Sequence, residues 1–121
     1  MRLDYWQKDR LRLGFRNVMK LEIKIAEEIG THLAEGSQAV AFRMVRLDPY
    51  INMHADIVLD FTGVRHGNSS FVNGLLTGLI EEHGEALLER LSFRGCNAIL
   101  RVLVEGAIAL GLDKHDHRAK A

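Results

Sequence analysis

The strongest constraint on the fold is a short, almost wholly apolar run, DIVLDF, at residues 56–61. Ile57, Val58 and Leu59 are consecutive, so a strand formed by this run carries apolar side chains on both faces. Such strands are typical of the centre of a parallel sheet that is covered by helices on both sides. The run therefore predicts a buried central strand in an α/β domain.

Two further segments have the pattern of strands. In KLEIKI (20–25) apolar residues alternate with charged ones, which indicates a strand with one buried face. LSFRG (91–95) is a shorter candidate. Together with residues 56–61 they predict three strands that are well separated along the chain.

The segment between the first two strands has helical features. Residues 26–36 have the character of a short helix or helical turn, with Gly36 as its stop. Ser37 is a candidate cap for a second helix over residues 38–47, in which apolar residues recur three and four apart. We expect Pro49 to end that helix, because proline restricts the residue before it and lacks an N–H donor.

A longer helix is predicted after the central strand. Phe71 begins two series of apolar residues at helical spacing, and the helix is expected to run to about His83, with Gly84 as its stop. Gly74 and Gly78 lie four apart within it, and each costs about 1 kcal/mol relative to alanine. We expect a close approach by a neighbouring element to compensate for this cost.

The remaining pieces complete the pattern. Residues 85–91 are predicted to be helical, and residues 97–112 form a strongly apolar helix with Asn97 as a candidate cap and Gly111 near its end. Alternating strands and helices predict one α/β domain with a mixed, mainly parallel sheet, flanking helices and right-handed crossovers.

We assign residues 19–113 to this domain. Residues 1–18 form a basic N-terminal extension, which a start at Met19 would leave out. Residues 114–121 form a polar C-terminal tail that we expect to be frayed.

Composition narrows the choice of partners. The 121-residue chain has 16 basic and 16 acidic residues, a balance that does not favour nucleic acid or an anionic membrane as the main partner. No apolar run approaches the ~20 residues of a membrane span. The single cysteine, Cys96, allows no internal disulfide and is expected to be a small buried residue, in keeping with a cytoplasmic protein. No cofactor is expected.

The stretch GVRHGNSSF (63–71) joins the central strand to the long helix and allows three interpretations. Asn68, Ser69 or Ser70 could simply cap the helix. A serine could instead be a phosphorylation switch, because a helix N-terminus carries unpaired N–H groups and partial positive charge that tolerate a phosphate.

The third interpretation is a hydrolase nucleophile, because Gly67-Asn68-Ser69 between strand and helix is similar to a nucleophile elbow. The second glycine of that elbow is replaced by Phe71, and the candidate acids and bases lie in the tail, which disfavours a serine hydrolase. These residues are Asp113, which ends the domain, and His115, Asp116 and His117 in the tail. The same tail histidines are poorly organised as metal ligands, so no metal site is expected.

Two polar residues flank the joint. His66 could adjust the local charge or contact a partner, although an ordinary loop histidine is the simpler interpretation. Asp60, at the end of the central strand, is expected to brace the following loop by hydrogen bonding.

DIVLDFTGVRHGNSSFVNGLL resembles the core motif of STAS domains, the fold of bacterial anti-sigma-factor antagonists and of sulfate-transporter tails. It is most similar to a family of small bacterial STAS-like proteins of unsettled function, over about Ile23 to Leu112. The residues that match the pattern are Asp60, Phe61, Gly63, Val64, Ser69, Ser70 and Phe71.

The resemblance implies a non-enzymatic regulatory module that binds a protein. In the antagonists, a GHKL-type serine kinase that is also the anti-sigma factor phosphorylates a serine, and Ser69 matches that serine. Asn68 and Phe71 stand where the antagonists have aspartate and glycine, and Phe71 is expected to add bulk to the docking surface.

The resemblance and the position of the joint together make six residues candidate phosphoacceptor or partner-binding positions: Asp60, His66, Asn68, Ser69, Ser70 and Phe71. The alternative is a small-molecule or nucleotide-binding sensor on the same fold. A homo-oligomer is compatible with either function.

Overall fold

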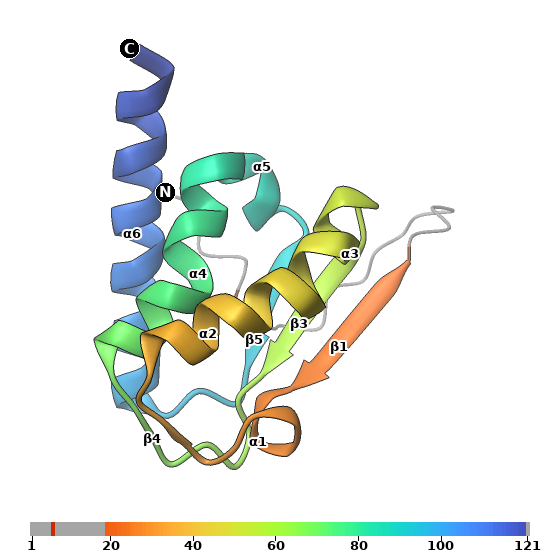
Figure 1. Cartoon of the computed structure of the whole chain (residues 1–121), viewed down its shortest axis with the longest axis vertical. Helices are drawn as coiled ribbons and strands as arrows, with labels where there is room; N and C mark the ends of the chain where they lie inside the picture. Colours follow the sequence, from red (N-terminus) through yellow and green to blue (C-terminus); the bar gives the residue numbers. More distant parts are fainter. Residues whose placement is uncertain (1–5, 7–18, 121) are drawn as a thin grey trace.

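A computed structural model describes Trp6 and residues 19–120 of the chain. The predicted N-terminal extension, residues 1–18, lies outside the described residues except for Trp6. Figure 1 shows a three-stranded sheet with a group of helices packed beside it.

The main sheet contains β1 (Lys20–Lys24), β3 (Asp56–Asp60) and β5 (Leu91–Arg94) in the order β1-β3-β5. Both pairings are parallel, and Leu59 lies opposite Ile23 on one side and Phe93 on the other. The predicted strands and the central position of β3 are confirmed. A second parallel pair, formed by β2 (His32–Leu33) and β4 (His66–Gly67), was not predicted.

The helical elements occupy the remaining segments. They are α1 (Ile25–Glu28), α2 (Gly36–Phe42), a π-helical turn η1 (Arg43–Leu47), α3 (Asp48–Asn52), α4 (Ser69–His83), α5 (Glu85–Leu88) and α6 (Ala98–Lys120). The chain is therefore an α/β domain with a parallel sheet flanked by helices, as predicted.

Among the described residues, one face of the main sheet packs into the hydrophobic core. Its side chains on that face are almost completely buried: Ile23, Ile57, Leu59, Leu91 and Phe93. The opposite face carries polar residues around Val58: Glu22, Lys24, Asp60, Ser92 and Arg94. The prediction that helices cover both faces of β3 is wrong for the described elements, since α2, α4 and α6 lie on one side (Figure 1).

The reason is topological. Each new strand, β3 after β1 and β5 after β3, is added in the same direction across the sheet. Right-handed crossovers that advance in one direction place their helices on the same face. The apolar character of Val58 therefore does not indicate a second helical layer.

Three of the predicted helix boundaries are wrong. In the segment 26–36, helix α1 covers only residues 26–28 and strand β2 follows it, because the segment turns to pair with β4. The next helix begins at Gly36 with no side-chain cap from Ser37. Pro49 does not end it, but lies in the first turn of α3, where the missing N–H costs little.

The glycines of α4 make the close approach that was predicted. A Cβ on Gly74 would lie 2.7 Å from the backbone oxygen of Gly36, and one on Gly78 would meet the Arg43 guanidinium. The backbones of α2 and α4 therefore come close together at Gly36 and Gly74. α4 ends at Gly84, whose φ of 69° favours glycine, as expected.

The last helix is longer than predicted. Asn97 caps α6 by accepting a hydrogen bond from Leu100 N at 2.9 Å, which confirms its predicted role. The helix continues to Lys120, so the expected frayed tail is helical instead. His115 contributes to this order, because its Nδ1 lies 2.8 Å from the Glu81 backbone oxygen. No helix in the described part of the chain is long and apolar enough to cross a membrane.

Trp6 is expected to contribute substantially to stability. Its side chain is 7% exposed, its ring lies 5.7 Å from that of Phe93, and the Arg101 guanidinium lies 4.2 Å from its centroid. We predict that Trp6→Ala lowers the free energy of unfolding by about 3 kcal/mol, measured by urea denaturation. Val45→Ala, at a position that is 72% exposed, serves as the control and should change it by less than about 0.5 kcal/mol. Equal effects of the two substitutions would contradict the packing of Trp6.

Candidate functional site

The candidate site is the connection from β3 to α4. Gly63 has a φ of 88°, a conformation that side chains disfavour, and the Val64 N–H donates to the Phe61 oxygen at 2.9 Å to close the turn. The chain then pairs with β2 through β4 before α4 begins at Ser69. The pairing of β4 with β2 therefore fixes the position of the residues directly before α4.

Asn68 is the cap of α4. Its side-chain oxygen accepts a hydrogen bond from Phe71 N at 2.9 Å, and its side-chain nitrogen donates to the Ala34 oxygen at 3.0 Å. Its backbone N–H donates to the Leu33 oxygen at 3.0 Å and so extends the pairing of β4 with β2. One residue thus ends the strand, starts the helix and ties both to the segment after β2.

The two serines are not used as caps. Ser69 and Ser70 are exposed, and within the described part of the chain neither hydroxyl makes a hydrogen bond. They differ in their surroundings, because a Cβ on Gly36 would lie 2.7 Å from Ser70 Oγ. Ser70 therefore packs against the start of α2.

The start of α4 is electrostatically suited to an anion. No acidic residue lies in the first turn of the helix. The N–H groups of the first turn and the helix dipole give this end partial positive charge. Negative charge added at Ser69 would therefore be stabilised by its own helix.

Phe71 is completely buried and belongs to the main hydrophobic cluster. The expectation that it adds bulk to the docking surface is wrong, and Phe71 is not available as a partner-binding residue. The reason is its place in the apolar face of α4, one helical turn before Leu75, which is also buried.

His66 lies against His32, a residue that no pattern in the sequence marked as functional. It is exposed and lies opposite His32 in the pairing of β2 with β4, with the ring centroids 4.9 Å apart. His32 lies in a segment predicted to be helical, so no local pattern indicated this contact. Only the long-range strand pairing reveals it.

Asp60 has the bracing role that was predicted. It is 8% exposed, accepts a hydrogen bond from Thr62 N at 2.9 Å, and pairs with Arg94 at 3.3 Å. Arg94 also pairs with Glu22, so the three side chains link all three strands on the polar face of the sheet. Asp60 is therefore held by its neighbours rather than free for a partner.

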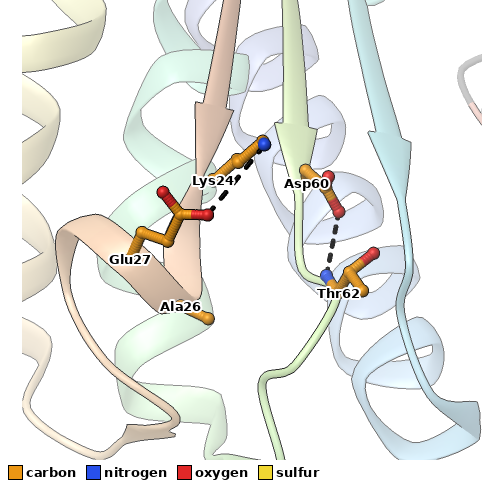
Figure 2. A pocket seen from close by; sticks show the side chains of 5 residues that line it. All are labelled: Lys24, Ala26, Glu27, Asp60 and Thr62. Carbon is orange, nitrogen blue, oxygen red and sulfur yellow. Dashed lines mark hydrogen bonds and ion pairs between the residues drawn. The ribbon is translucent and has the colours of Figure 1, made fainter.

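A small pocket lies at the ends of β1 and β3, beside Asp60. Its volume is about 210 Å³, and Figure 2 shows the side chains that line it: Lys24, Ala26, Glu27, Asp60 and Thr62. Lys24 and Glu27 approach to 3.9 Å across its rim. The pocket thus combines one cationic and two anionic side chains.

The residues proposed for a hydrolase do not come together. A Cβ on Gly84, at the end of α4, would lie 2.5 Å from His115 Nε2, so His115 is beside that end. Ser69 is at the other end of this 15-residue helix, about 22 Å away. No general base from the tail is therefore within reach of Ser69.

Cys96 is partly buried, and burial raises the pKa of its thiol to about 12, so the unreactive thiol form dominates at neutral pH. Within Trp6 and residues 19–120, no three His, Cys, Asp or Glu side chains form a group that could hold a metal ion.

Comparison with known proteins identifies one family. The model of the STAS-like domain of unknown function (DUF4325) matches residues 38–99, a little over half of the chain. This range contains β3, the candidate site and α4, and it confirms the resemblance over a shorter range than expected. Neither a curated protein nor a solved structure matches the chain.

The assignment of the cap can be tested by comparing two adjacent substitutions. We predict that Asn68→Ala lowers the free energy of unfolding by about 1–2 kcal/mol, because the cap and the bond to Ala34 are both lost. Ser69→Ala should change it by less than about 0.5 kcal/mol. Urea denaturation measures both, and a larger loss for Ser69→Ala would assign the capping role to the serine.

Proposed function

The chain belongs to the family of STAS-like domains of unknown function, and we propose that it is a non-enzymatic regulatory module that binds a protein partner through the start of α4. In this proposal, phosphorylation of Ser69 switches the binding. The partner is a serine kinase of the GHKL type that also acts as an anti-sigma factor, as in the antagonists that the chain resembles.

The observation on which the proposal rests is that capping of α4 and exposure of a serine hydroxyl fall to two different residues, Asn68 and Ser69. Asn68 makes the capping hydrogen bond, and the adjacent Ser69 is exposed, with no hydrogen bond from its hydroxyl among the described residues. A modification of Ser69 therefore removes no interaction that the fold needs. This is a requirement for a switch that changes the surface without unfolding the domain.

The electrostatics of the helix end support the same residue. A phosphate on Ser69 would lie at the positive end of α4, where no acidic side chain of the first turn opposes it. It would add roughly −1.5 to −2 charge at neutral pH. A partner surface that fits the uncharged hydroxyl would then be repelled by the charge of the phosphate, or would be kept from close contact by its size.

Ser69 is a better acceptor than Ser70 for a steric reason. Ser70 packs against Gly36 at the close contact between α4 and α2. A phosphate on Ser70 would have to find room beside that contact, whereas Ser69 precedes it and is open. Asn68, which replaces the aspartate of the antagonists, retains an oxygen that caps the helix.

The switch predicts a specific result for charge substitutions. Ser69→Asp should weaken binding to the GHKL-type kinase of the same organism by at least tenfold, measured by titration calorimetry. Its free energy of unfolding should stay within about 0.5 kcal/mol of the wild type or rise slightly, because an acidic group suits a helix N-terminus. Incubation with the kinase and ATP should add one phosphate to the wild type and none to Ser69→Ala, measured by intact mass spectrometry.

Ser70→Ala is the matched control, since it removes the neighbouring hydroxyl and should leave both phosphorylation and binding unchanged. Phosphorylation of Ser69→Ala, or unaltered binding by Ser69→Asp, would contradict the proposed switch.

The pocket beside Asp60 favours a second candidate function, binding of a small polar molecule. It lies at the carboxyl ends of β1 and β3, where α/β proteins commonly bind ligands. Its volume of about 210 Å³ is below the ~300–1,000 Å³ of usual ligand pockets. A small molecule with both charges therefore fits better than a whole nucleotide.

A thermal-shift screen with small zwitterions, such as amino acids, tests this candidate. A ligand that binds only the folded state should raise the melting temperature of the wild type. Lys24→Met and Thr62→Val should abolish the shift, because they remove polar groups from the pocket lining. Ser69→Ala, which lies at the other site, should retain it. An unchanged melting temperature with every zwitterion would count against a sensor.

A further inference from the structure

Two histidines are brought together by the small sheet of β2 and β4. His32 and His66 occupy directly opposite positions in this parallel pair, so their side chains leave the same face of the sheet. Their ring centroids are 4.9 Å apart, with an angle of 41° between the ring planes. Both residues are exposed, so neither ring is placed there by burial in the core.

Each of the two rings has a nitrogen lone pair available for a ligand. His32 Nδ1 lies 3.0 Å from the Thr31 hydroxyl, and in the tautomer whose Nδ1–H donates to that hydroxyl, Nε2 carries a free lone pair. Histidines that bind a metal through one ring nitrogen usually donate a hydrogen bond from the other, most often to a carboxylate, a backbone carbonyl or water. At His32 the Thr31 hydroxyl would take that place. Within the described part of the chain, the ring nitrogens of His66 have no hydrogen-bond partner.

The spacing of the rings matches the requirement of a shared metal ion. An imidazole nitrogen lies about 2.0–2.1 Å from a bound zinc ion, so the ring centroid lies about 3.2 Å from it. Two rings that share one ion at angles of about 90–110° therefore have centroids roughly 4.5–5.2 Å apart. The observed 4.9 Å lies within this interval. Because both side chains are exposed, small rotations can direct one nitrogen of each ring toward a common point.

We propose that His32 and His66 form a surface site for a divalent transition-metal ion of the zinc, nickel or copper type. Imidazole is a good ligand for these ions and a poor one for magnesium or calcium. Two protein ligands leave open coordination positions, which water or an oxygen ligand of another molecule can fill. This inference does not depend on the proposed switch at Ser69.

The site would also join two segments that are distant in sequence. A metal ion held by both histidines would link β2 to β4 beside the cap of α4, since Asn68 follows His66 by two residues. A metal ion that binds only the folded arrangement stabilises it by mass action. Metal binding should therefore raise the melting temperature as well as give a direct binding signal.

The test uses the full chain without an affinity tag, titrated with ZnCl₂ and NiCl₂ by calorimetry near neutral pH. The wild type should bind one ion, and His32→Asn and His66→Asn should each weaken binding by at least tenfold, because each removes one of the two ligands. The double variant should be little worse than either single variant. His117→Asn is the control, since this exposed histidine lies near the far end of α6 and should not affect binding.

A second measurement does not depend on how the variants fold. Long-range ¹H–¹⁵N spectra of the wild-type imidazole rings should show shifts at His32 and His66 with the first equivalent of zinc. Shifts at His115 and His117 instead, no saturable binding at millimolar metal, or undiminished affinity in both single variants would each overturn the proposal.

Discussion

The parallel pairing of β1, β3 and β5 is the constraint on which the rest of the structure depends. Because the strands are added in one direction, right-handed crossovers place α2, α4 and α6 on the same face of the sheet. One face then carries the apolar residues of the core, and the other is occupied by polar side chains with the ion pairs of Arg94. The same arrangement brings the ends of β1 and β3 together at the pocket beside Asp60.

The candidate site depends on how closely α4 packs against its neighbours. Gly36 and Gly74 let the backbones of α2 and α4 approach each other. Ser70 packs against Gly36 at the same contact. Asn68 connects the start of α4 to the segment after β2. Within the described part of the chain, Asn68 makes the capping hydrogen bond and Ser70 packs against Gly36, whereas the Ser69 hydroxyl makes no hydrogen bond. This difference supports the proposal of a switch at Ser69.

Several parts of the fold were predictable from local pattern. The alternation in KLEIKI, the apolar run at residues 56–61 and the helical periodicity after Phe71 led to the correct elements, because burial of one or both faces leaves a period in the sequence. Residue type alone identified some of the helix caps and not others. Asn97 was identified as a cap correctly, whereas Asn68, Ser69 and Ser70 were equally suitable by residue type and only the hydrogen bond to Phe71 distinguishes them.

The errors arose where distant segments meet. Residues 32–33 form a strand because β4 is available to pair with them. A two-residue strand is too short to produce a recognisable pattern of apolar residues in the sequence. The last residues of the chain are helical in part because His115 reaches the end of α4. Phe71 was placed on the surface by comparison with a glycine in the antagonists, although its spacing to Leu75 is that of a buried helix face.

The sequence by itself determined the class of fold, the family and the position of the serine-containing joint, since these follow from residue pattern along one segment. Tertiary structure alone decided that Asn68 rather than a serine caps α4 and that His32 faces His66. Each of these depends on a contact between segments that are remote in sequence or on the direction of a side chain within a packed helix. Local propensity contains no information on either, because such contacts exist only after the strands have paired and the helices have packed.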